Sequence, residues 1–240
     1  SACLVGSEMC IRDRDRRDYK KAKRCLRELV IMVSKLLDDE IVIASHNKGK
    51  IIEFADLFKD YKLNLSSSAD YNIEEPEENG SSFAANALIK ARTTMIGSGK
   101  IAISDDSGLC VDSLNGEPGM YSARWAGSNK DFAMAMEKIK EKLLELDTKN
   151  TNANFFCALA VVWPNEEYRV YEGAVHGNLN FPPRGNLGFG YDPIFIPTGF
   201  DISFGEMEPA KKHSMSHRAV AFDKLKNCLL YTSPSPRDRL

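Results

Sequence analysis

Several features common in other protein classes are missing from this sequence. No apolar run approaches the roughly 20 residues that a membrane-spanning helix needs. The six cysteines form no C-x-x-C pair and no cluster with zinc spacing. The chain also has no P-loop motif, no internal repeat and no low-complexity tract. We therefore expect a soluble cytoplasmic protein with free thiols, no membrane partner and no zinc centre.

Composition and charge narrow the class further. Of the 240 residues, 43% are hydrophobic and 28% are charged, which predicts a globular chain long enough for one large domain or two lobes. The formal net charge is −2, but residues 11–28 hold nine of the 32 Lys and Arg residues, so the rest of the chain is acidic. The basic segment is either a solvated stretch, the simpler interpretation, or an RNA-binding arm. Because an acidic body disfavours broad nucleic-acid binding, we expect no nucleic-acid partner.

Both ends of the chain differ in character from its body. Residues 3–14 and 228–240 resemble translated sequencing-adapter read-through, and we set them aside from the fold. Met32 is a plausible start, because a compact pattern of strands and helices begins just after it. We therefore expect a non-native or adapter-like extension at 1–31, one folded domain at 32–227 and an adapter-like tail at 228–240.

Apolar periodicity predicts alternating strands and helices between these ends. The expected strands cover residues 41–44, 101–104, 155–163, 168–180 and 194–196. The expected helices cover residues 51–58, 82–96, 132–146 and 219–225. This pattern is typical of an α/β protein with a partly antiparallel sheet, whose long strands could belong to a second lobe. A cleft between lobes is a common place for a ligand.

Two adjacent carboxylates, Asp105 and Asp106, come directly after the expected strand at 101–104. Ligands gather beyond the carboxyl ends of strands in open α/β sheets, and carboxylate oxygens suit Mg²⁺. Turn acids are the simpler alternative, but two neighbouring acids repel each other unless a cation offsets the repulsion. Asp106 could also take a proton from an attacking water. Arg124, downstream, is a fixed positive charge suited to phosphate.

Two polar loops precede expected helices. The loop at 45–50, S-H-N-K-G-K, offers backbone N–H groups and lysines to an anion, although an ordinary polar turn would look the same. The loop at 74–80, E-E-P-E-E-N-G, either supports the next helix through its dipole or supplies a metal ligand. Neither loop is decisive alone.

Two later segments suit a base and its sugar. In residues 185–195, Phe189 and Tyr191 offer faces for stacking and Asp192 can accept a hydrogen bond, although a tight aromatic turn is a serious alternative. Lys212 and residues 216–218, S-H-R, form a basic cluster before the last helix.

Taken together and in order, these segments resemble the inosine/xanthosine triphosphate pyrophosphatase family, which clears deaminated purine nucleotides. The resemblance rests on residues 45–50, 77–92 (E-E-N-G-S-S-F-A-A-N-A-L-I-K-A-R), 105–112 (D-D-S-G-L-C-V-D), 116–124 (G-E-P-G-M-Y-S-A-R), 188–195 (G-F-G-Y-D-P-I-F) and 216–218. It implies an elongated, two-lobed α/β protein with a mixed sheet, flanking helices and a central substrate cleft, usually a homodimer. The implied reaction is hydrolysis of ITP, dITP or XTP to the monophosphate and pyrophosphate with Mg²⁺, carried out by the domain at 32–227.

The resemblance also implies roles for individual residues. Asp106 would be the catalytic proton acceptor, and the metal would be held by Asp106 with Glu78 or its neighbour Glu77. The residues that would bind substrate are Ser45, His46, Asn47, Lys48, Gly49, Lys50, Lys90, Ser107, Phe189, Gly190, Tyr191, Asp192, Lys212, His217 and Arg218. His46 stands where the family often has a small residue. The alternatives are a pyrophosphatase for another modified nucleotide and a nucleotide-binding sensor without turnover.

Overall fold

The structure, a computed structural model, describes residues 40–61 and 63–230. The predicted extension at 1–31, the proposed start at Met32 and most of the predicted tail lie outside these residues. Residues 40–225 belong to one compact unit, which is described below. No helix in the described ranges is long and apolar enough to cross a membrane.

One six-stranded mixed sheet forms the centre of this unit. Its strands are β1 (Ile41–Ile43), β2 (Leu65–Ser67), β3 (Ile101–Val111), β4 (Asn152–Val162), β5 (Tyr168–Leu179) and β6 (Phe195–Pro197). They lie in the order β2-β1-β3-β4-β5-β6. β1 pairs in parallel with β2 and β3, and all other pairs are antiparallel. The predicted α/β class with a partly antiparallel sheet is confirmed.

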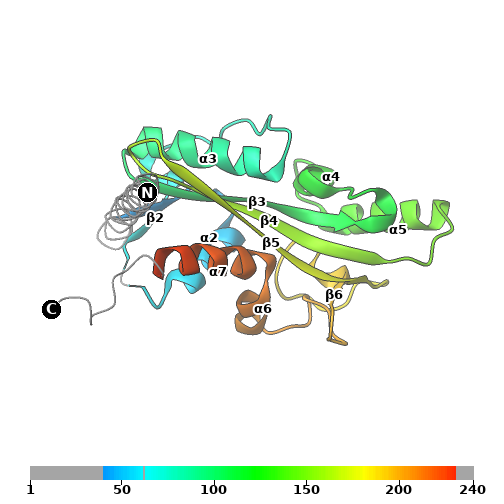
Figure 1. The fold of residues 1–240 in the computed structure, drawn as a ribbon. Coiled ribbons are helices and arrows are strands. Elements are labelled where there is room, and N and C mark those ends of the chain that lie inside the picture. The colour runs from blue at the N-terminus through cyan, green and yellow to red at the C-terminus, as the bar shows by residue number, and fades with distance from the viewer. Residues whose placement is uncertain (1–39, 62, 231–240) are drawn as a thin grey trace, which may run out of the picture. The chain divides into compact units, whose positions relative to one another are not determined.

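Helices cover both faces of this sheet (Figure 1). They are α2 (Lys48–Phe58), α3 (Phe83–Ser98), α4 (Ser122–Trp125), α5 (Phe132–Glu145), α6 (Pro209–Met215) and α7 (His217–Leu230). α3 lies on one face of the long strands and α7 on the other (Figure 1). The four helices expected from periodicity are all present, whereas α4, α6 and strand β2 are too short to give a periodic signal.

The two ends of α3 are fixed by local chemistry. Ser82 is the N-cap, and its hydroxyl accepts a hydrogen bond from the Ala85 amide at 3.1 Å. Gly99 ends the helix in the left-handed conformation, with φ of 66°, and donates its N–H to the Met95 carbonyl. Both ends lie within three residues of the helix expected at 82–96.

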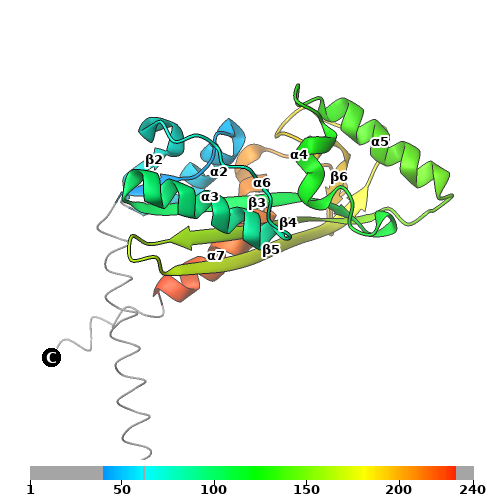
Figure 2. The same cartoon turned by 90° about the horizontal axis from the view of Figure 1, so that it is seen from above.

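Two apolar clusters hold α3 and α5 over different parts of the sheet (Figure 2). One cluster joins small residues of α3 to the start of β3 and the end of β4; it includes Ala87, Ala91, Ala102 and Val162. The other joins α5 to the opposite end of these strands and to the segment around β6; it includes Ile139, Leu109, Ala153, Phe195 and Phe204. Each helix therefore covers its own stretch of the long strands.

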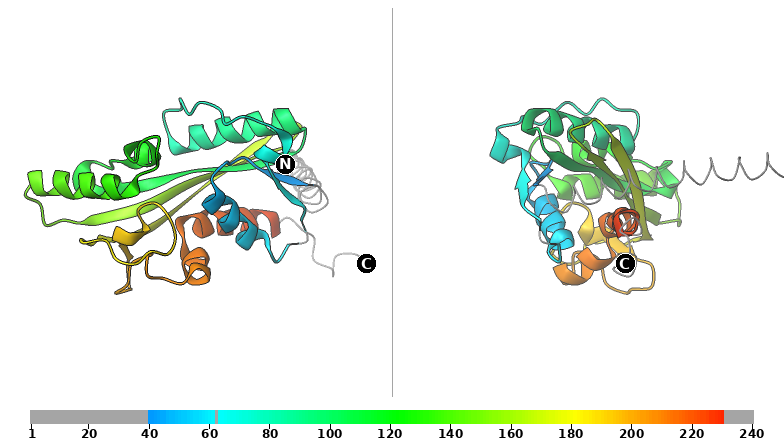
Figure 3. Two further views of the ribbon diagram at one scale, coloured as in Figure 1. Left: turned by 180° about the vertical axis from the view of Figure 1, so that it is seen from behind. Right: turned by 60° about the vertical axis from the view of Figure 1, so that its left-hand side comes forward.

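Helices α2, α6 and α7 gather on the other side of the sheet (Figure 3). The rings of Phe58 in α2 and Phe222 in α7 meet edge to face, with centroids 4.8 Å apart. α7 approaches β5 so closely at Gly173 that an added Cβ would lie 2.2 Å from the His217 carbonyl oxygen. The first turn of α7 can lie this close to the sheet only because Gly173 has no side chain.

β3 differs from the prediction. We expected a strand at 101–104 that ends before Asp105, but β3 continues to Val111. Its first three residues pair with β1 on one side, while β4 pairs with it from Ala102 to Val111 on the other. Because β4 satisfies the backbone along this whole length, the chain stays extended through the polar residues. Asp105 and Asp106 therefore lie within a strand rather than in a turn.

Candidate active site

A cavity of about 510 Å³ opens among segments that are far apart in the sequence. Its volume falls within the usual range for small-molecule sites. The predicted site residues that line it are Ser45, His46, Asn47, Lys50, Glu78, Lys90, Asp106, Ser107, Phe189, Gly190, Tyr191, Asp192, Lys212, His217 and Arg218. Lys48, Gly49 and Glu77 do not line it. The fold thus brings most of the predicted site residues around one space.

The loop at 45–50 forms one wall of the cavity. Asn47 caps α2, and its Oδ1 accepts hydrogen bonds from the amides of Gly49 at 2.9 Å and Lys50 at 3.4 Å. We expected these amides to be available to an anion, but both already donate to Asn47. Any anion bound by this loop would therefore depend more on the side chains of Ser45 and Lys50. Gly49 packs on another wall instead, because a Cβ there would lie 2.9 Å from the Phe189 ring.

Asp105 and Asp106 do not form a joint metal pair, which corrects our expectation from the sequence. Neighbouring side chains on a strand point to opposite faces of the sheet. Asp105 binds Lys50 at 3.1 Å and Arg218 at 2.7 Å. Asp106 binds Lys90 at 3.2 Å. Each carboxylate has its own cation, which relieves the repulsion expected between adjacent acids.

Asp106 is held by two side chains of α3 and is 5% exposed. Lys90 donates to its Oδ1 and Asn86 donates to its Oδ2, both at 3.2 Å. Burial raises the pKa of Asp106, and the ammonium groups of Lys90 and Lys50 oppose that rise. Lys90 is buried too, yet the carboxylates of Asp106, Asp105 and Glu78 raise its pKa above the usual lysine value. The pair therefore consists of a lysine held charged and a carboxyl group with raised proton affinity.

The carboxylates of Glu78 and Asp106 both bind the ammonium group of Lys90, so they face one common position. Mg²⁺ is typically held by one or two carboxylates together with substrate phosphates. The oxygen donors of Glu78 and Asp106 fit such an ion. Glu77 is exposed and lies outside the cavity lining. No group of three or more His, Cys, Asp or Glu side chains that could hold a metal occurs in residues 40–61 and 63–230.

A chain of buried ion pairs runs along the cavity and includes several of its lining residues. Arg218, 0% exposed, bonds to Asp105 at 2.7 Å and also binds Glu53. Lys212 bonds to the same Glu53 at 3.2 Å and to Asp192 at 2.6 Å. Burial lowers the pKa of Arg218 to about 9, so the guanidinium stays charged at neutral pH. These alternating charges connect Lys50, in the loop at 45–50, to Asp192 on the aromatic side of the cavity.

Aromatic rings form that other side. The Lys212 ammonium lies 4.5 Å from the centre of the Phe189 ring, which is partly exposed. His217 stacks on Phe155 at a centroid distance of 5.2 Å and an interplanar angle of 15°. Burial, followed by the charge of Lys212, lowers the pKa of His217 to about 3, so the imidazole is neutral. Within the described part of the chain its Nδ1 has no hydrogen-bond partner.

Several residues at this site were missed or given no role by the sequence reading. Glu53 and Asn86 are buried polar groups on helices, and their partners are visible only in the fold. Phe155 lines the cavity from β4. Arg124, noted earlier only as a positive charge, donates to the Glu78 carbonyl at 2.7 Å and so holds the acidic loop. A charged residue on the buried face of α2 is the one local signal that could have identified Glu53.

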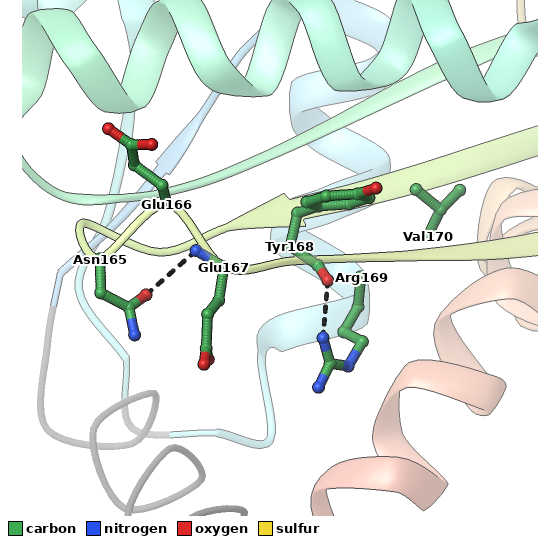
Figure 4. Close-up of a pocket in the computed structure, with 6 residues that line it drawn as sticks. All are labelled: Asn165, Glu166, Glu167, Tyr168, Arg169 and Val170. Carbon is green, nitrogen blue, oxygen red and sulfur yellow. Dashed lines mark hydrogen bonds between the residues drawn. The ribbon is translucent and has the colours of Figure 1, made fainter.

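A second pocket lies over the turn between β4 and β5 (Figure 4). It is lined by six consecutive residues, 165–170, and by none of the predicted site residues. Its hydrogen bonds hold the turn itself: Asn165 accepts from the Glu167 amide, and Arg169 donates to the Tyr168 carbonyl (Figure 4). This pocket carries no grouping that suggests chemistry.

Comparisons with known proteins show similarity to one family. A sequence model described as the Ham1 family matches residues 41–228. A protein of Rhodospirillum centenum named dITP/XTP pyrophosphatase is 50% identical over 188 residues, 78% of this chain and 93% of that protein. Its counterpart of the same name in Caulobacter vibrioides is 52% identical over 190 residues, 79% of this chain and 97% of that protein. The structure of a HAM1 protein from Coxiella burnetii matches with a TM-score of 0.74 and 36% identity, covering 80% and 98% of the two chains.

Proposed function

The chain belongs to the Ham1 family, and on this premise we propose that it hydrolyses deaminated purine nucleoside triphosphates. The substrates are dITP, ITP and XTP, and the products are the nucleoside monophosphate and pyrophosphate. One observation carries the proposal. A single cavity joins the carboxylates of Glu78 and Asp106 to the cationic side chain of Lys50 and to the aromatic ring of Phe189. A nucleoside triphosphate needs these three kinds of group together.

The triphosphate lies in this proposal along the wall built by Ser45, Asn47 and Lys50, within reach of Lys90. Lysines are compact charges that neutralise phosphoryl oxygens. Lys50 is tied to Asp105 and Lys90 to Asp106, so both ammonium groups are already positioned. Preorganised charge of this kind stabilises the negative charge that grows on the departing pyrophosphate.

Water attacks the α-phosphorus, and Asp106 accepts its proton. Burial raises the pKa of Asp106 toward the range in which a carboxylate is an effective base. Lys90 and Asn86 hold both of its oxygens and so fix its orientation. Glu78 and Asp106 would hold Mg²⁺, which when bound neutralises phosphate charge and polarises the phosphoryl group. Ser107 is placed beside Asp105 and Arg218 to contact the substrate.

Base selection falls to the aromatic side of the cavity. Phe189 offers a ring for stacking, and His217 lines the cavity with a buried Nδ1 that has no hydrogen-bond partner among residues 40–61 and 63–230. In its Nδ1–H tautomer, His217 donates to a 6-keto oxygen, whereas a 6-amino group is itself a donor and leaves this hydrogen bond unmade. A buried donor left unpaired can reject a substrate by a factor of ~10⁴. Asp192 and Lys212 hold the neighbouring wall through their 2.6 Å ion pair.

We extend the proposal to a homodimer that acts in the cytoplasm. Support for the dimer comes from the family resemblance, and support for the location comes from the free nucleotide pool on which such an enzyme acts. Sedimentation of the purified full chain measures the assembly directly, and a mass of one chain at micromolar concentration would contradict the dimer.

Pyrophosphate release from dITP, XTP, ATP and GTP with Mg²⁺ tests the function. We expect fast release from dITP and XTP and little from ATP and GTP. Asp106→Asn should lower kcat by about 10²–10⁴-fold, because the proton acceptor is lost. The neutral amide leaves Lys90 with Glu78 as its remaining charged partner, so the unfolding midpoint of Asp106→Asn should fall somewhat while the protein stays folded at pH 7, and kcat is compared on folded protein. Binding without release by the wild-type protein would favour a sensor, and preference for a modified pyrimidine would favour another pyrophosphatase.

A further inference from the structure

Asn86 is a buried amide between two parts of the active site. It lies on the inner face of α3 and is 2% exposed. Its Oδ1 accepts a hydrogen bond from the Gly80 amide at 2.8 Å. Its Nδ2 donates to Asp106 Oδ2 at 3.2 Å. One side chain thus connects the acidic loop to the proposed proton acceptor.

The contacts around Asn86 close into a ring. Asn86 and Lys90 are one helical turn apart on the same face of α3, and they bind the two different oxygens of Asp106. Lys90 also binds Glu78, and Gly80 follows Glu78 by two residues. The ring therefore runs from Asn86 through Gly80, Glu78 and Lys90 to Asp106. It fixes the distance between the two carboxylates that would hold the metal.

Gly80 packs tightly against α3 at this ring of contacts. A Cβ on Gly80 would lie 2.6 Å from Asn86 Oδ1 and 2.8 Å from the Ala85 Cβ. The site also needs one acceptor, for the Gly80 amide, and one donor, for Asp106. A side-chain amide supplies both, whereas a carboxylate supplies only acceptors and an aliphatic chain supplies neither.

We propose that Asn86 is a positioning residue of the hydrolysis: it orients the Asp106 carboxylate and sets the position of Glu78 relative to it. This inference rests on the proposed function. It assigns Asn86 an effect on turnover and metal affinity rather than on nucleotide contact, because Asn86 does not line the cavity.

Three variants separate this role from a structural one. Asn86→Asp keeps the acceptor for Gly80 and removes the donor to Asp106, and Asn86→Leu removes both. Thr94→Val, two turns along the same buried face, is the control. Loss of a residue that orients a metal ligand typically costs 10–100-fold. We expect kcat for dITP to fall by about this factor in both Asn86 variants, with KM within about twofold of wild type, and no change in the control.

A second readout does not depend on turnover. Mn²⁺ is titrated by electron paramagnetic resonance in the presence of the α,β-imido analogue of dITP. Asn86→Leu should bind Mn²⁺ about 10-fold more weakly than wild type, and Thr94→Val should match wild type. A folded Asn86→Asp protein with kcat within twofold of wild type would overturn the inference, since Asn86 would then serve only the loop. If the wild-type protein neither releases pyrophosphate nor binds Mn²⁺ with the analogue, the proposed function falls, and the inference with it.

Discussion

Lys90 holds a single ammonium group between the carboxylates of Glu78 and Asp106. These are the carboxylates that we propose would hold the metal, so a lysine charge and a divalent cation would compete for neighbouring positions. The carboxylates raise the pKa of Lys90, which means that the folded state favours its charged form at all pH values below the usual lysine range. Lys90 therefore stabilises the acidic centre of the protein without bound nucleotide.

Lys90→Met should destabilise the protein and make it depend on divalent cations. Removing one partner of a buried ion pair costs at most about 3–5 kcal/mol, and the partial exposure of Glu78 reduces that cost. Mg²⁺ can take the vacated position between two oxygen donors, so it should raise the melting temperature of Lys90→Met more than that of wild type. Thermal unfolding with and without Mg²⁺ measures the difference. Lys90→Arg, which keeps the charge, is the control, and an equal Mg²⁺ response in all three proteins would contradict the idea.

Individual residues also show where sequence reasoning stops. The motif around Asp105 and Asp106 is a local signal, because polar residues directly follow a short apolar run, and two of its residues, Asp106 and Ser107, line the cavity. Their different ion-pair partners were not predictable, because the two side chains face opposite sides of the sheet only if β3 stays extended through both residues. Glu53 is the stronger example, since its partner Lys212 lies 159 residues later.

Among the elements, the contact between β5 and α7 sets the position of His217 in the cavity lining. Gly173 of β5 lies directly beneath the first turn of α7, where the nearest atoms to an added Cβ belong to the backbone of His217 and Ala221. Backbone atoms cannot rotate away as side-chain ends can. The position of His217 in the cavity therefore depends on the absence of a side chain at Gly173.

Gly173→Ala should push α7 away from the sheet. The added Cβ would lie 2.2 Å from the His217 carbonyl oxygen and 2.5 Å from the Ala221 amide nitrogen. Overpacking of this kind costs about 1–3 kcal/mol in unfolding free energy. Because His217 moves with the helix, KM for dITP should rise several-fold as well. Urea unfolding and steady-state kinetics measure the two effects.

Gly97→Ala provides the matched control for Gly173→Ala. Gly97 lies in α3, and an added Cβ there meets only side-chain atoms of Ile73. Alanine also favours a helix over glycine by up to about 1 kcal/mol. The expected loss of stability is therefore smaller, with KM unchanged. Equal effects of the two substitutions would mean that the fit of α7 on β5 has no special role.

The ends of a helix were predictable where residues typical of helix caps stand in the sequence. Ser82 and Gly99 cap α3, and because serine and glycine are typical cap residues, the ends of this helix were visible in the sequence. The end of β3 was not, because its length is set by pairing with β4 rather than by its own residues. Strand β2 has only three residues, too few for any alternation to be read, and it is defined by its parallel pairing with β1.

Across the whole unit, one chain of alternating charges joins segments from both ends of the described sequence. It runs from Lys50 through Asp105, Arg218, Glu53 and Lys212 to Asp192. Breaking a buried pair leaves an uncompensated charge, so these segments are expected to hold their positions together. The motifs in the sequence predicted most of the residues around the cavity. The network that fixes their mutual placement arises only on folding.

The neutral His217 ring should make this folded unit sensitive to acid. Its folded pKa is about 3, whereas an unfolded imidazole titrates near ~6.5. As pH falls below about 6.5, the imidazole takes up a proton in the unfolded chain but stays neutral in the folded chain. The free energy of unfolding therefore falls by about 1.4 kcal/mol per pH unit until the folded pKa is reached. Between pH 7 and pH 5 this amounts to about 2 kcal/mol.

His217→Phe keeps a ring against Phe155 and removes the titration of the imidazole. Its unfolding free energy, measured in urea at pH 7 and pH 5, should therefore fall by about 2 kcal/mol less between these pH values than that of wild type. Asp106 and Asp192, whose pKa values are raised by burial, act in the opposite direction in both proteins, so the difference between the two slopes isolates His217. Identical slopes would mean that the imidazole is charged, or free to become so, in the folded protein.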